Sequence, residues 1–370
     1  MRQIINKYSR ASVSMVYMMS NNEVMNQVIA FNRNMNGLLT FVGAYPTNGR
    51  GTGTREVSTA TANDGVDPLT SQGALTLSRD GRFLLAVNAG SHSISSFIIT
   101  DNGTPVLVDV KPSGGAQPNS VDVFGNLVYV SNVGNPANNF TSNITGSHID
   151  DNGRLTPFPG SIHSLSTFNA QPAQVLFTPD GSKIIVSELT SNHLSVFYVN
   201  KNGTLTGPIV NESYGKGPLG CFFLSSGILL VTEADSNALS SYSLSNDGKL
   251  HVISGSVPNG YKTACWVVTT RDERFAYITN TLSGTISTYR IDSNGALSVV
   301  RHITSTPPGT AAGLPMDVGV SKDGRHFYTL NGNQGTVSVF TIQDDGSLVS
   351  LQVAAWTNFP YFGSQGLAVL

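Results

Sequence analysis

Short runs of alternating hydrophobic and polar residues follow one another along the chain, and many of these runs are separated by Asn-Gly or Asp-Gly. Such dipeptides adopt positive φ at low cost and, between alternating runs, predict the tight turns of β-hairpins. The seven turns of one series are Asn36-Gly37, Asn102-Gly103, Asn152-Gly153, Asn202-Gly203, Asp247-Gly248, Asn294-Gly295 and Asp345-Gly346. Because they recur roughly every 50 residues, the sequence predicts a repeated unit of antiparallel strands.

A second pattern runs in step with these turns. Ahead of most of them a hydrophobic strand ends in an amide or acidic residue, and another strand precedes it, often with its own hairpin turn, as at Asp80-Gly81, Asp180-Gly181 and Asp323-Gly324. The strands that end this way are Leu85–Asn88, Val128–Asn132, Ile185–Glu188, Leu230–Glu233, Tyr277–Asn280 and Tyr328–Asn331. Each unit is therefore predicted to contain four strands.

Four-stranded units repeated seven times, with no helix between them, predict an all-β, seven-bladed β-propeller of antiparallel blades. The N-terminal blade lacks its innermost strand, because Met15–Ser20 and Val28–Phe31 supply only later strands. The C-terminal run Ser364–Leu370 reads like Ser71–Leu77, the first strand of the next blade. We therefore expect the C-terminal strand to pair with the N-terminal blade and close the ring, which removes free sheet edges.

Length and composition agree with one domain. The uniform period leaves no linker, so we expect an N-terminal extension at 1–14 and a single propeller domain at 15–370. Only 12% of the residues are charged and the formal net charge is −2, which gives no electrostatic reason to bind nucleic acid or an anionic membrane. We expect neither as a partner, and the oligomeric state stays open.

Cofactor chemistry has little support in the residues. Cys221 and Cys265 are the only cysteines and fall in predicted innermost strands, where we expect buried, inert thiols; a disulfide or reactive pair is the alternative. No histidine pair has metal-ligand spacing on a regular element. The glycine cluster at Asn48–Gly53 lacks the Gly-Lys-Ser/Thr ending of a phosphate loop. We expect no metal and no other cofactor.

The compartment stays open. Residues 1–14 carry Arg2, Lys7 and Arg10 without an apolar core, so they are not an intact secretory signal, which slightly favours a cytoplasmic chain. Five sequons would suit a secreted glycoprotein, at Asn102, Asn139, Asn143, Asn202 and Asn211. The sequons at Asn102 and Asn202 also arise from hairpin chemistry alone.

Strand direction predicts which residues share a face of the propeller. The start of each innermost strand and the end of the next strand lie on the same face, because adjacent antiparallel strands reverse direction. A ring of side chains is therefore expected at the mouth of the central channel, comprising Asn88, Asn132, Glu188, Glu233, Asn280 and Asn331, with Gln72 and Trp266 from the segments that lead into innermost strands. As an alternative, the asparagines are turn formers that bond their own backbone.

The two glutamates carry the chemical hypothesis. Glu188 and Glu233 replace asparagine at the same structural place in neighbouring blades, where a carboxylate gains nothing as a turn former. Like charges held close would raise the pKa of one of them and leave an acid beside a base. The alternative is a pair of solvated carboxylates. His163 lies in a long loop that can fold over the mouth, and the long segment Gly43–Thr70 is expected to form a mobile rim.

Stretches spread over nearly the whole chain resemble a known family. They are Ser71–Leu75, Phe83–Gly90, Gln117–Val121, Val231–Ala234, Leu239–Tyr242, Ile253–Val257, Cys265–Val267 and Tyr277–Asn280. They look like the lactonase family of seven-bladed propellers, which includes bacterial phosphogluconolactonases and fungal carboxymuconate lactonising enzymes. The resemblance implies the propeller fold and an activity on a small sugar or organic-acid lactone.

Lactone hydrolysis needs a base to activate water, donors for the oxyanion and an acid for the departing alkoxide. If the resemblance holds for activity, we assign Glu188 or Glu233 as base and His163 as acid. The remaining substrate contacts would come from the amides of Gln72, Asn88, Asn132, Asn280 and Asn331, from Trp266 as an apolar wall, and from Lys216, Lys262 and Arg301 as the nearest cations.

The sequence therefore predicts a lactone hydrolase or lactonising cyclase whose site is the channel mouth. A non-catalytic propeller that presents one face to a protein or glycan is the alternative, because low charge with many Asn, Ser and Thr residues suits a binding surface. A scaffold whose site has decayed is the third possibility, and fold alone does not choose among them.

Overall fold

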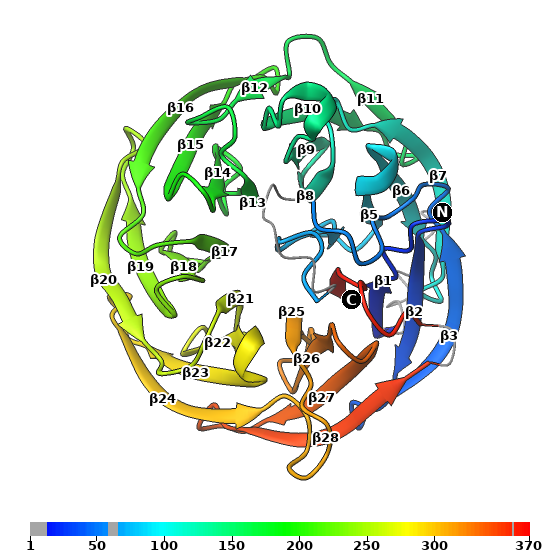
Figure 1. Ribbon diagram of the computed structural model, residues 1–370, viewed down its shortest axis with the longest axis vertical. Helices are drawn as coiled ribbons and strands as arrows, with labels where there is room; N and C mark the ends of the chain where they lie inside the picture. Colours follow the sequence, from blue (N-terminus) through cyan, green and yellow to red (C-terminus); the bar gives the residue numbers. More distant parts are fainter. Residues whose placement is uncertain (1–12, 58–65, 357–358) are drawn as a thin grey trace, which may run out of the picture.

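The computed structural model describes residues 13–57, 66–356 and 359–370, which form seven antiparallel sheets arranged as blades around a central channel (Figure 1). The seven-bladed propeller predicted from the sequence is confirmed. We number the blades from the one that contains the first strand. Nearly all of the predicted N-terminal extension, at 1–14, lies outside the described residues.

Blade 1 combines both ends of the chain. Its strands, from the channel outward, are β29 (Leu367–Val369), β1 (Met15–Met19), β2 (Gln27–Arg33) and β3 (Leu39–Pro46). β1 pairs antiparallel with β29, with Val16 opposite Val369 and Met18 opposite Leu367. The predicted closure of the ring by the C-terminal strand is therefore confirmed.

Each remaining blade uses consecutive strands, again ordered from the channel outward. Blade 2 contains β4 (Leu75–Leu77), β5 (Phe83–Asn88), β6 (Ser93–Ile99) and β7 (Pro105–Pro112). Blade 3 contains β8 (Pro118–Phe124), β9 (Leu127–Asn132), β10 (Asn143–Ile149) and β11 (Leu155–Pro157), and the two-residue β12 (His163–Ser164) also pairs with β10. Blade 4 contains β13 (Pro172–Phe177), β14 (Lys183–Glu188), β15 (His193–Val199) and β16 (Leu205–Glu212).

The last three blades repeat this order. Blade 5 contains β17 (Pro218–Phe223), β18 (Leu229–Glu233), β19 (Ala238–Leu244) and β20 (Leu250–Pro258). Blade 6 contains β21 (Ala264–Thr269), β22 (Phe275–Asn280), β23 (Thr285–Ile291) and β24 (Leu297–Thr304). Blade 7 contains β25 (Pro315–Val320), β26 (His326–Asn331), β27 (Thr336–Ile342) and β28 (Leu348–Ala355).

Helical structure is confined, in the described ranges, to three 3-10 turns of three residues, η1 (Ala89–Ser91), η2 (Pro136–Asn138) and η3 (Thr281–Ser283). None of these turns has the length or the apolar composition to cross a membrane.

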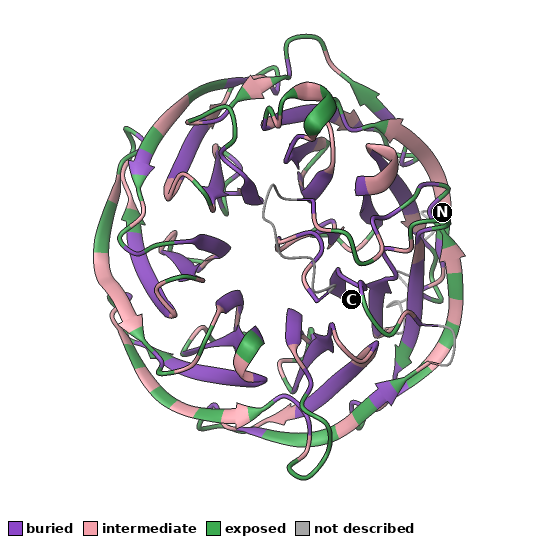
Figure 2. Cartoon of the chain, viewed as in Figure 1, coloured by how far each residue is buried: buried purple, intermediate pink, exposed green. Residues whose placement is uncertain are grey.

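Burial follows the position of a strand in its blade (Figure 2). Second strands such as β5 and β22 are buried along their whole length, because the neighbouring blades cover both of their faces. The outermost β24 instead alternates between half-buried and exposed residues. Alternation therefore marks the rim of the propeller, and continuous hydrophobic runs mark its interior.

The two faces of the disc are built differently. The loop face carries the loops between second and third strands and the connections between blades, whereas the turn face carries the hairpin turns. At the turn face Gly37, Gly103 and Gly346 have φ of 85°, 82° and 77°, which a side chain would strain. This explains the repeated glycine in the sequence.

The innermost strands of blades 3 to 7 share a β-bulge near the loop face. The pairing register shifts between Pro118 and Ser120 in β8, and between Met316 and Val318 in β25. Bulges re-aim side chains and disturb pairing locally. They place Asn119 and Asp317 at the loop-face end of the channel.

The two cysteines lie where the sequence predicts. Cys221 in β17 and Cys265 in β21 are free and buried, which confirms two buried thiols in innermost strands. Burial raises the pKa of the Cys221 thiol to about 12, so this side chain stays protonated and inert at neutral pH.

Candidate functional site

Glu188, the last residue of β14, is fully buried within blade 4. Its carboxylate accepts hydrogen bonds from the hydroxyls of Ser166, Ser191 and Ser195 and from the Ser166 backbone N–H. These serines come from the connection between blades 3 and 4, from the loop after β14 and from β15. Glu188 therefore ties three segments of the loop face together.

Glu233, the last residue of β18, has the same environment in blade 5. It is fully buried and accepts hydrogen bonds from the Gly215 N–H and from the hydroxyls of Ser240 and Ser256. Neither glutamate lies at the open rim where the adjoining pair was expected, because each is enclosed by donors from its own blade and from the connection that leads into it. Their catalytic role stays a prediction without a contact between them to support it.

The strand-end asparagines repeat this arrangement with the donor and acceptor roles reversed. The amide groups of Asn88, Asn280 and Asn331 each donate to two hydroxyls of the following strand, and that of Asn132 donates to the Asn143 Oδ1. All four asparagines are fully buried. The contacts match the structural interpretation of these residues, although their partners are neighbouring side chains rather than their own backbone.

The other predicted residues are dispersed. His163 is half-buried in β12, where it lies against Phe197 and burial lowers the pKa of its imidazole. Lys216 and Lys262 are exposed on the loop face, in the connections into blades 5 and 6. Arg301 points to the rim and pairs with Asp345 at 2.8 Å. The structure does not bring these residues to one pocket.

Residues 66–72 lie across the loop-face mouth of the channel. The Trp266 Nε1 and the Gln365 Nε2 both donate to the Ser71 carbonyl, each at 2.9 Å. The Leu69 carbonyl accepts from the Asn119 amide, and the Leu69 N–H donates to the Gln365 Oε1 at 2.8 Å. Figure 1 shows the described residues that lead into β4, from residue 66 onward, near the centre of the ring. The mouth expected to hold substrate is therefore spanned by this segment, and Trp266 is buried beneath it.

Gln72 extends this barrier into the channel itself. Its backbone N–H donates to the Ala173 carbonyl in blade 4, while its side-chain amide exchanges two hydrogen bonds of 3.0 Å with the backbone of Val267 in blade 6. The Gln72 side chain thus joins opposite sides of the channel. The hydrogen bonds to Ala173 and Val267 hold Gln72 in place.

Below this barrier lies a cavity of about 260 Å³ inside the channel. Its wall combines hydrophobic side chains of the innermost strands with a few polar groups, namely Gln72, Thr76, Asp122, Gln174 and Asp317. The two charged groups of this lining are both acidic. A concave wall with a few convergent polar groups is typical of a small-molecule site.

Asp317 sits at the bulge of β25 and is 3% exposed. Its backbone has φ of 27°, on the positive side where residues with a side chain are strained. The carboxylate accepts the Gly366 N–H at 2.6 Å. Burial raises the pKa of Asp317 to about 7, and burial together with the charge of Asp317 raises the pKa of neighbouring Asp67 to about 8.

Asp122 lies further along the channel, in β8, and is half-buried. Its carboxylate accepts the Phe177 N–H of the next blade and the Val123 N–H, both at 2.8 Å. Burial raises the pKa of Asp122 to about 6, against the hydrogen bonds that lower it. Asp122 and Asp317 are thus two carboxyl groups in one cavity, each with a pKa close to neutral pH.

These two aspartates are the functional candidates that the sequence did not single out. A carboxylate inside the hydrophobic run Val121–Phe124 was an available signal, because aspartate is rare in strands and seldom buried. Asp317 lies near the start of the innermost strand β25, but only the bulge turns it toward the channel.

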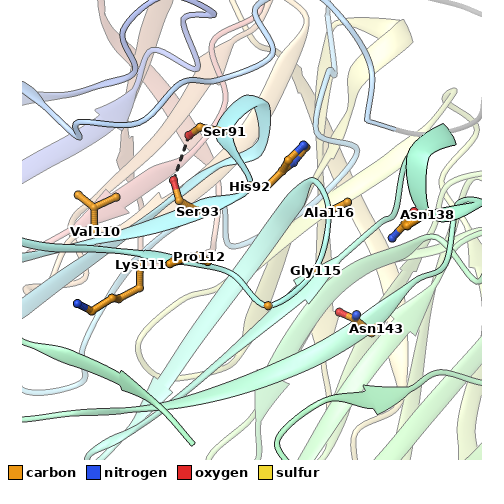
Figure 3. A pocket seen from close by; sticks show the side chains of 11 residues that line it. Ser91, His92, Ser93, Val110, Lys111, Pro112, Gly115, Ala116, Asn138 and Asn143 are labelled. Atoms are coloured by element: carbon orange, nitrogen blue, oxygen red, sulfur yellow. Dashed lines mark hydrogen bonds between the residues drawn. The ribbon is translucent and has the colours of Figure 1, made fainter.

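A second hollow, of about 630 Å³, opens on the loop face between blades 2 and 3 (Figure 3). His92, Asn138 and Asn143 face it, and the His92 Nδ1 accepts the Gln117 N–H at 3.0 Å. The residues that line it include no carboxylate. This hollow therefore offers hydrogen-bonding groups, the His92 imidazole and the cation Lys111, but no carboxylate.

Comparison with known proteins identifies the family. The chain matches the family described as "Lactonase, 7-bladed beta-propeller" over residues 10–163, 136–269 and 265–360. These matches together span most of the chain and agree with the seven blades of the structure. The chain belongs to the lactonase family of seven-bladed β-propellers.

Curated relatives in this family are distant. The 6-phosphogluconolactonase of Enterobacter sp. (strain 638) is 24% identical over 224 residues, which cover 55% of this chain and 61% of that protein. The 6-phosphogluconolactonase of Erwinia tasmaniensis is 23% identical over 281 residues, covering 71% of this chain and 77% of that protein. The chain thus spans about three fifths of the length of the first relatives that it matches.

Solved structures support the fold alone. The periplasmic gluconolactonase of Pseudomonas aeruginosa superposes with a TM-score of 0.73 at 17% identity, covering 97% of this chain and 99% of that chain. The virginiamycin B lyase of Staphylococcus aureus superposes with a TM-score of 0.54 at 15% identity, over 76% of this chain and 84% of that chain. Because a lactonase and a lyase both share the architecture, activity has to be argued from the site.

Proposed function

We propose that this protein hydrolyses a small lactone in the channel cavity, with Asp122 and Asp317 as its acid and base. The observation that carries the proposal is the presence of two carboxyl groups with pKa values of about 6 and about 7 in the wall of one cavity of a lactonase-family propeller. General acid and base groups work best when their pKa lies near the operating pH.

The roles follow from the surroundings of the two groups, because Asp122 accepts two backbone N–H groups, which favour its ionised form, whereas Asp317 accepts one. Asp122, with the lower pKa, is the group that is mostly ionised at neutral pH, and it takes a proton from the attacking water. Asp317 retains its proton more readily and gives it to the ring oxygen when the carbon–oxygen bond breaks. Gln174 accepts the Cys221 N–H with its Oε1, so its amide nitrogen is the end that can donate to the oxyanion.

The same cavity suggests the charge of the substrate. Both charged side chains of its lining are acidic, and its volume of about 260 Å³ is at the small end for a ligand site. A lactone that carries a phosphate or a carboxylate group would be repelled by these acidic side chains. The preferred substrate is therefore a neutral lactone, such as an unphosphorylated sugar lactone.

A panel of neutral and phosphorylated sugar lactones, with proton release as the readout, tests this function. We expect turnover of neutral members, and a loss of at least about a hundredfold in Asp122→Asn and Asp317→Asn, the usual contribution of a general acid or base. Asp109→Asn is the matched control, because Asp109 accepts the Val110 and Leu155 N–H groups in the manner of Asp122 but lies outside the channel. Unchanged rates in both channel variants would refute the assignment.

The same measurements also test two other functions. The same two groups would serve lactone formation in the reverse direction, so an unsaturated or hydroxy acid belongs in the panel. The hollow between blades 2 and 3, whose lining has hydrogen-bonding groups and no carboxylate, favours a non-catalytic role in binding a protein or glycan. Retention of a glycan by a protein that turns over no lactone would support that alternative.

A further inference from the structure

Six of the seven junctions between blades share one hydrogen bond near the turn face. In each, a side chain of one blade donates to the carbonyl of the turn glycine of the next blade. The six bonds are Tyr17 to Gly103, Ser96 to Gly153, Tyr129 to Gly203, Asn211 to Gly248, Ser241 to Gly295 and Tyr277 to Gly346. None of these donors titrates near neutral pH.

The seventh junction, which closes the ring between blades 7 and 1, lacks this bond. Tyr328 occupies in β26 the position that Tyr277 occupies in β22, three residues before the strand-end asparagine. Yet within the described ranges the buried Tyr328 hydroxyl has no hydrogen-bond partner. The closing junction must therefore be held in another way.

Histidine replaces a hydrophobic residue at the same junction. Met15, Leu127, Ile228 and Phe275 lie against the turn glycines at four of the other junctions. At the closing junction the corresponding residue is His326, whose ring lies so close to Gly37 that an added Cβ would overlap it. His326 is only 4% exposed. A titratable ring thus fills the place that a hydrophobic side chain holds at those four junctions. The His148 ring also approaches Gly203, but at 3.4 Å from an added Cβ and beside Leu127.

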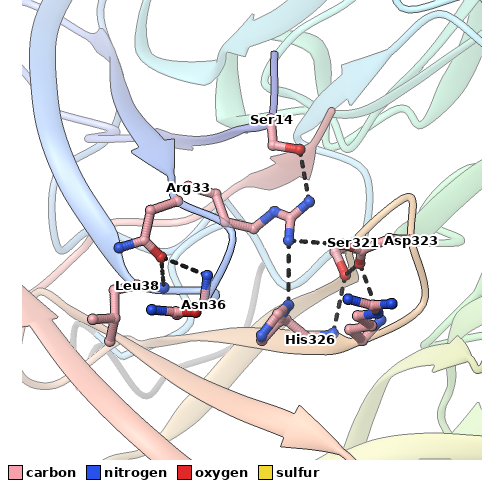
Figure 4. Close-up of polar contacts among 9 residues, drawn as sticks. Ser14, Arg33, Asn36, Leu38, Ser321, Asp323 and His326 are labelled. Atoms are coloured by element: carbon pink, nitrogen blue, oxygen red, sulfur yellow. Dashed lines mark hydrogen bonds and ion pairs between the residues drawn. The ribbon is translucent and has the colours of Figure 1, made fainter. Parts of the chain in front are cut away.

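Arg33 of β2 connects His326 to blade 1 (Figure 4). Its guanidinium contacts the His326 Nδ1 at 3.3 Å, the Asp323 carboxylate at 2.9 Å and the Ser14 hydroxyl at 2.7 Å. Arginine is always a donor, so the His326 Nδ1 must be the acceptor and the ring must be neutral. Its other nitrogen is then the donor to the Asn36 backbone.

We propose that the junction between blades 7 and 1 is an acid-sensitive seam, at which protonation of His326 loosens the closure of the ring while the junction between blades 6 and 7 stays unchanged. Protonation turns the Nδ1 into a donor that faces the Arg33 guanidinium. The hydrogen bond is then lost, and two cations lie in contact in a buried site.

The charged groups around His326 give the direction of the effect. Burial and the cationic Arg33 and Arg325 lower the pKa of His326, against the opposing influence of Asp323. A hollow at the turn face is lined by His326 and by Asp344 and Asp345 of the β27–β28 turn. Because its folded-state pKa lies below the unfolded value of about 6.5, this histidine destabilises the fold as pH falls below that value.

The channel aspartates act in the opposite direction. Their folded-state pKa values of about 6 and about 7 exceed the unfolded value, so their contribution favours the fold at low pH and is lost as pH rises through those values. A global unfolding curve mixes the two effects. The seam therefore has to be measured locally.

Hydrogen exchange followed by mass spectrometry gives that local measurement in the wild-type protein. Protection factors, corrected for intrinsic rates, are compared at about pH 7.5 and about pH 5.5, on either side of the ordinary histidine pKa of about 6.5. We expect protection of β2 and β26 to fall about fivefold relative to β22 and β27, the change for losing one buried hydrogen bond. An equal change at the junction between blades 7 and 1 and at the junction between blades 6 and 7 would overturn the proposal.

The variant His326→Gln sharpens the test, since glutamine keeps an acceptor for Arg33 and a donor for Asn36 but does not titrate. We expect its seam to show the same protection at both pH values. His302→Gln is the control, because burial also lowers the pKa of His302, which lies in blade 6 away from the seam. Acid-induced loosening that survives in His326→Gln would contradict the proposal. If this variant does not fold, the wild-type measurement alone decides.

Discussion

Buried carboxylates occur both inside the blades and in the channel, but their surroundings differ. Glu188 and Glu233 each accept hydrogen bonds from two or three serine hydroxyls and a backbone N–H. Asp317 and Asp122 are held by backbone N–H groups, and burial raises the pKa of both. The same chemical group is thus fully provided with donors in one region and sparsely provided in the other.

This difference separates structure from chemistry. A carboxylate surrounded by donors stabilises the segments that supply them, and its charge is already compensated. A carboxylate in a cavity with few donors exchanges protons near neutral pH and is available to a ligand. Under the proposed function, the strand-end glutamates therefore maintain the fold and the channel aspartates transfer protons.

Replacing a strand-end glutamate should cost stability. In Glu188→Gln or Glu233→Gln, one accepting oxygen becomes an amide donor among hydroxyl donors, which costs about 1–3 kcal/mol for a buried group left unsatisfied. We expect the free energy of unfolding in urea to fall by that amount and lactone turnover by the folded protein to stay unchanged.

The exposed Glu212 at the end of β16 provides the control, since Glu212→Gln should leave the unfolding curve in place. A large loss of turnover in Glu188→Gln or Glu233→Gln, with unaltered stability, would show that the strand-end glutamates rather than the channel aspartates carry out the chemistry.

A smaller effect should distinguish two equivalent tyrosines. Tyr277→Phe removes the hydrogen bond to the Gly346 carbonyl and should lower the free energy of unfolding by about 1 kcal/mol. Tyr328→Phe removes a hydroxyl that has no partner among the described residues and should cost nothing. Urea unfolding of both variants at neutral pH is the measurement, and equal losses would show that the closing junction resembles the others.

The fold could be predicted from local sequence because each blade repeats a local signal. The turn glycines, the continuous hydrophobic second strands and the likeness of Ser364–Leu370 to Ser71–Leu77 all depend on residues close together in the chain. Register and closure follow from these features once the blades pack side by side.

The site could not be predicted in the same way, because it depends on contacts between distant residues. The serines that satisfy Glu188 include Ser166, which belongs to the connection from another blade. The loop-face mouth is spanned only because Ser71 meets Trp266 and Gln365. Likewise, Asp317 faces the channel because of a bulge that no local sequence pattern predicts.

The pH dependence of kcat/KM for a neutral lactone tests the central assignment most directly. With the uncatalysed reaction subtracted, we expect a maximum between about pH 6 and about pH 7, where Asp122 is ionised and Asp317 is protonated. Asp122→Asn should lose the acid limb of this profile and Asp317→Asn the alkaline limb. Both limbs retained in both variants, or limbs displaced by Glu188→Gln instead, would contradict the account.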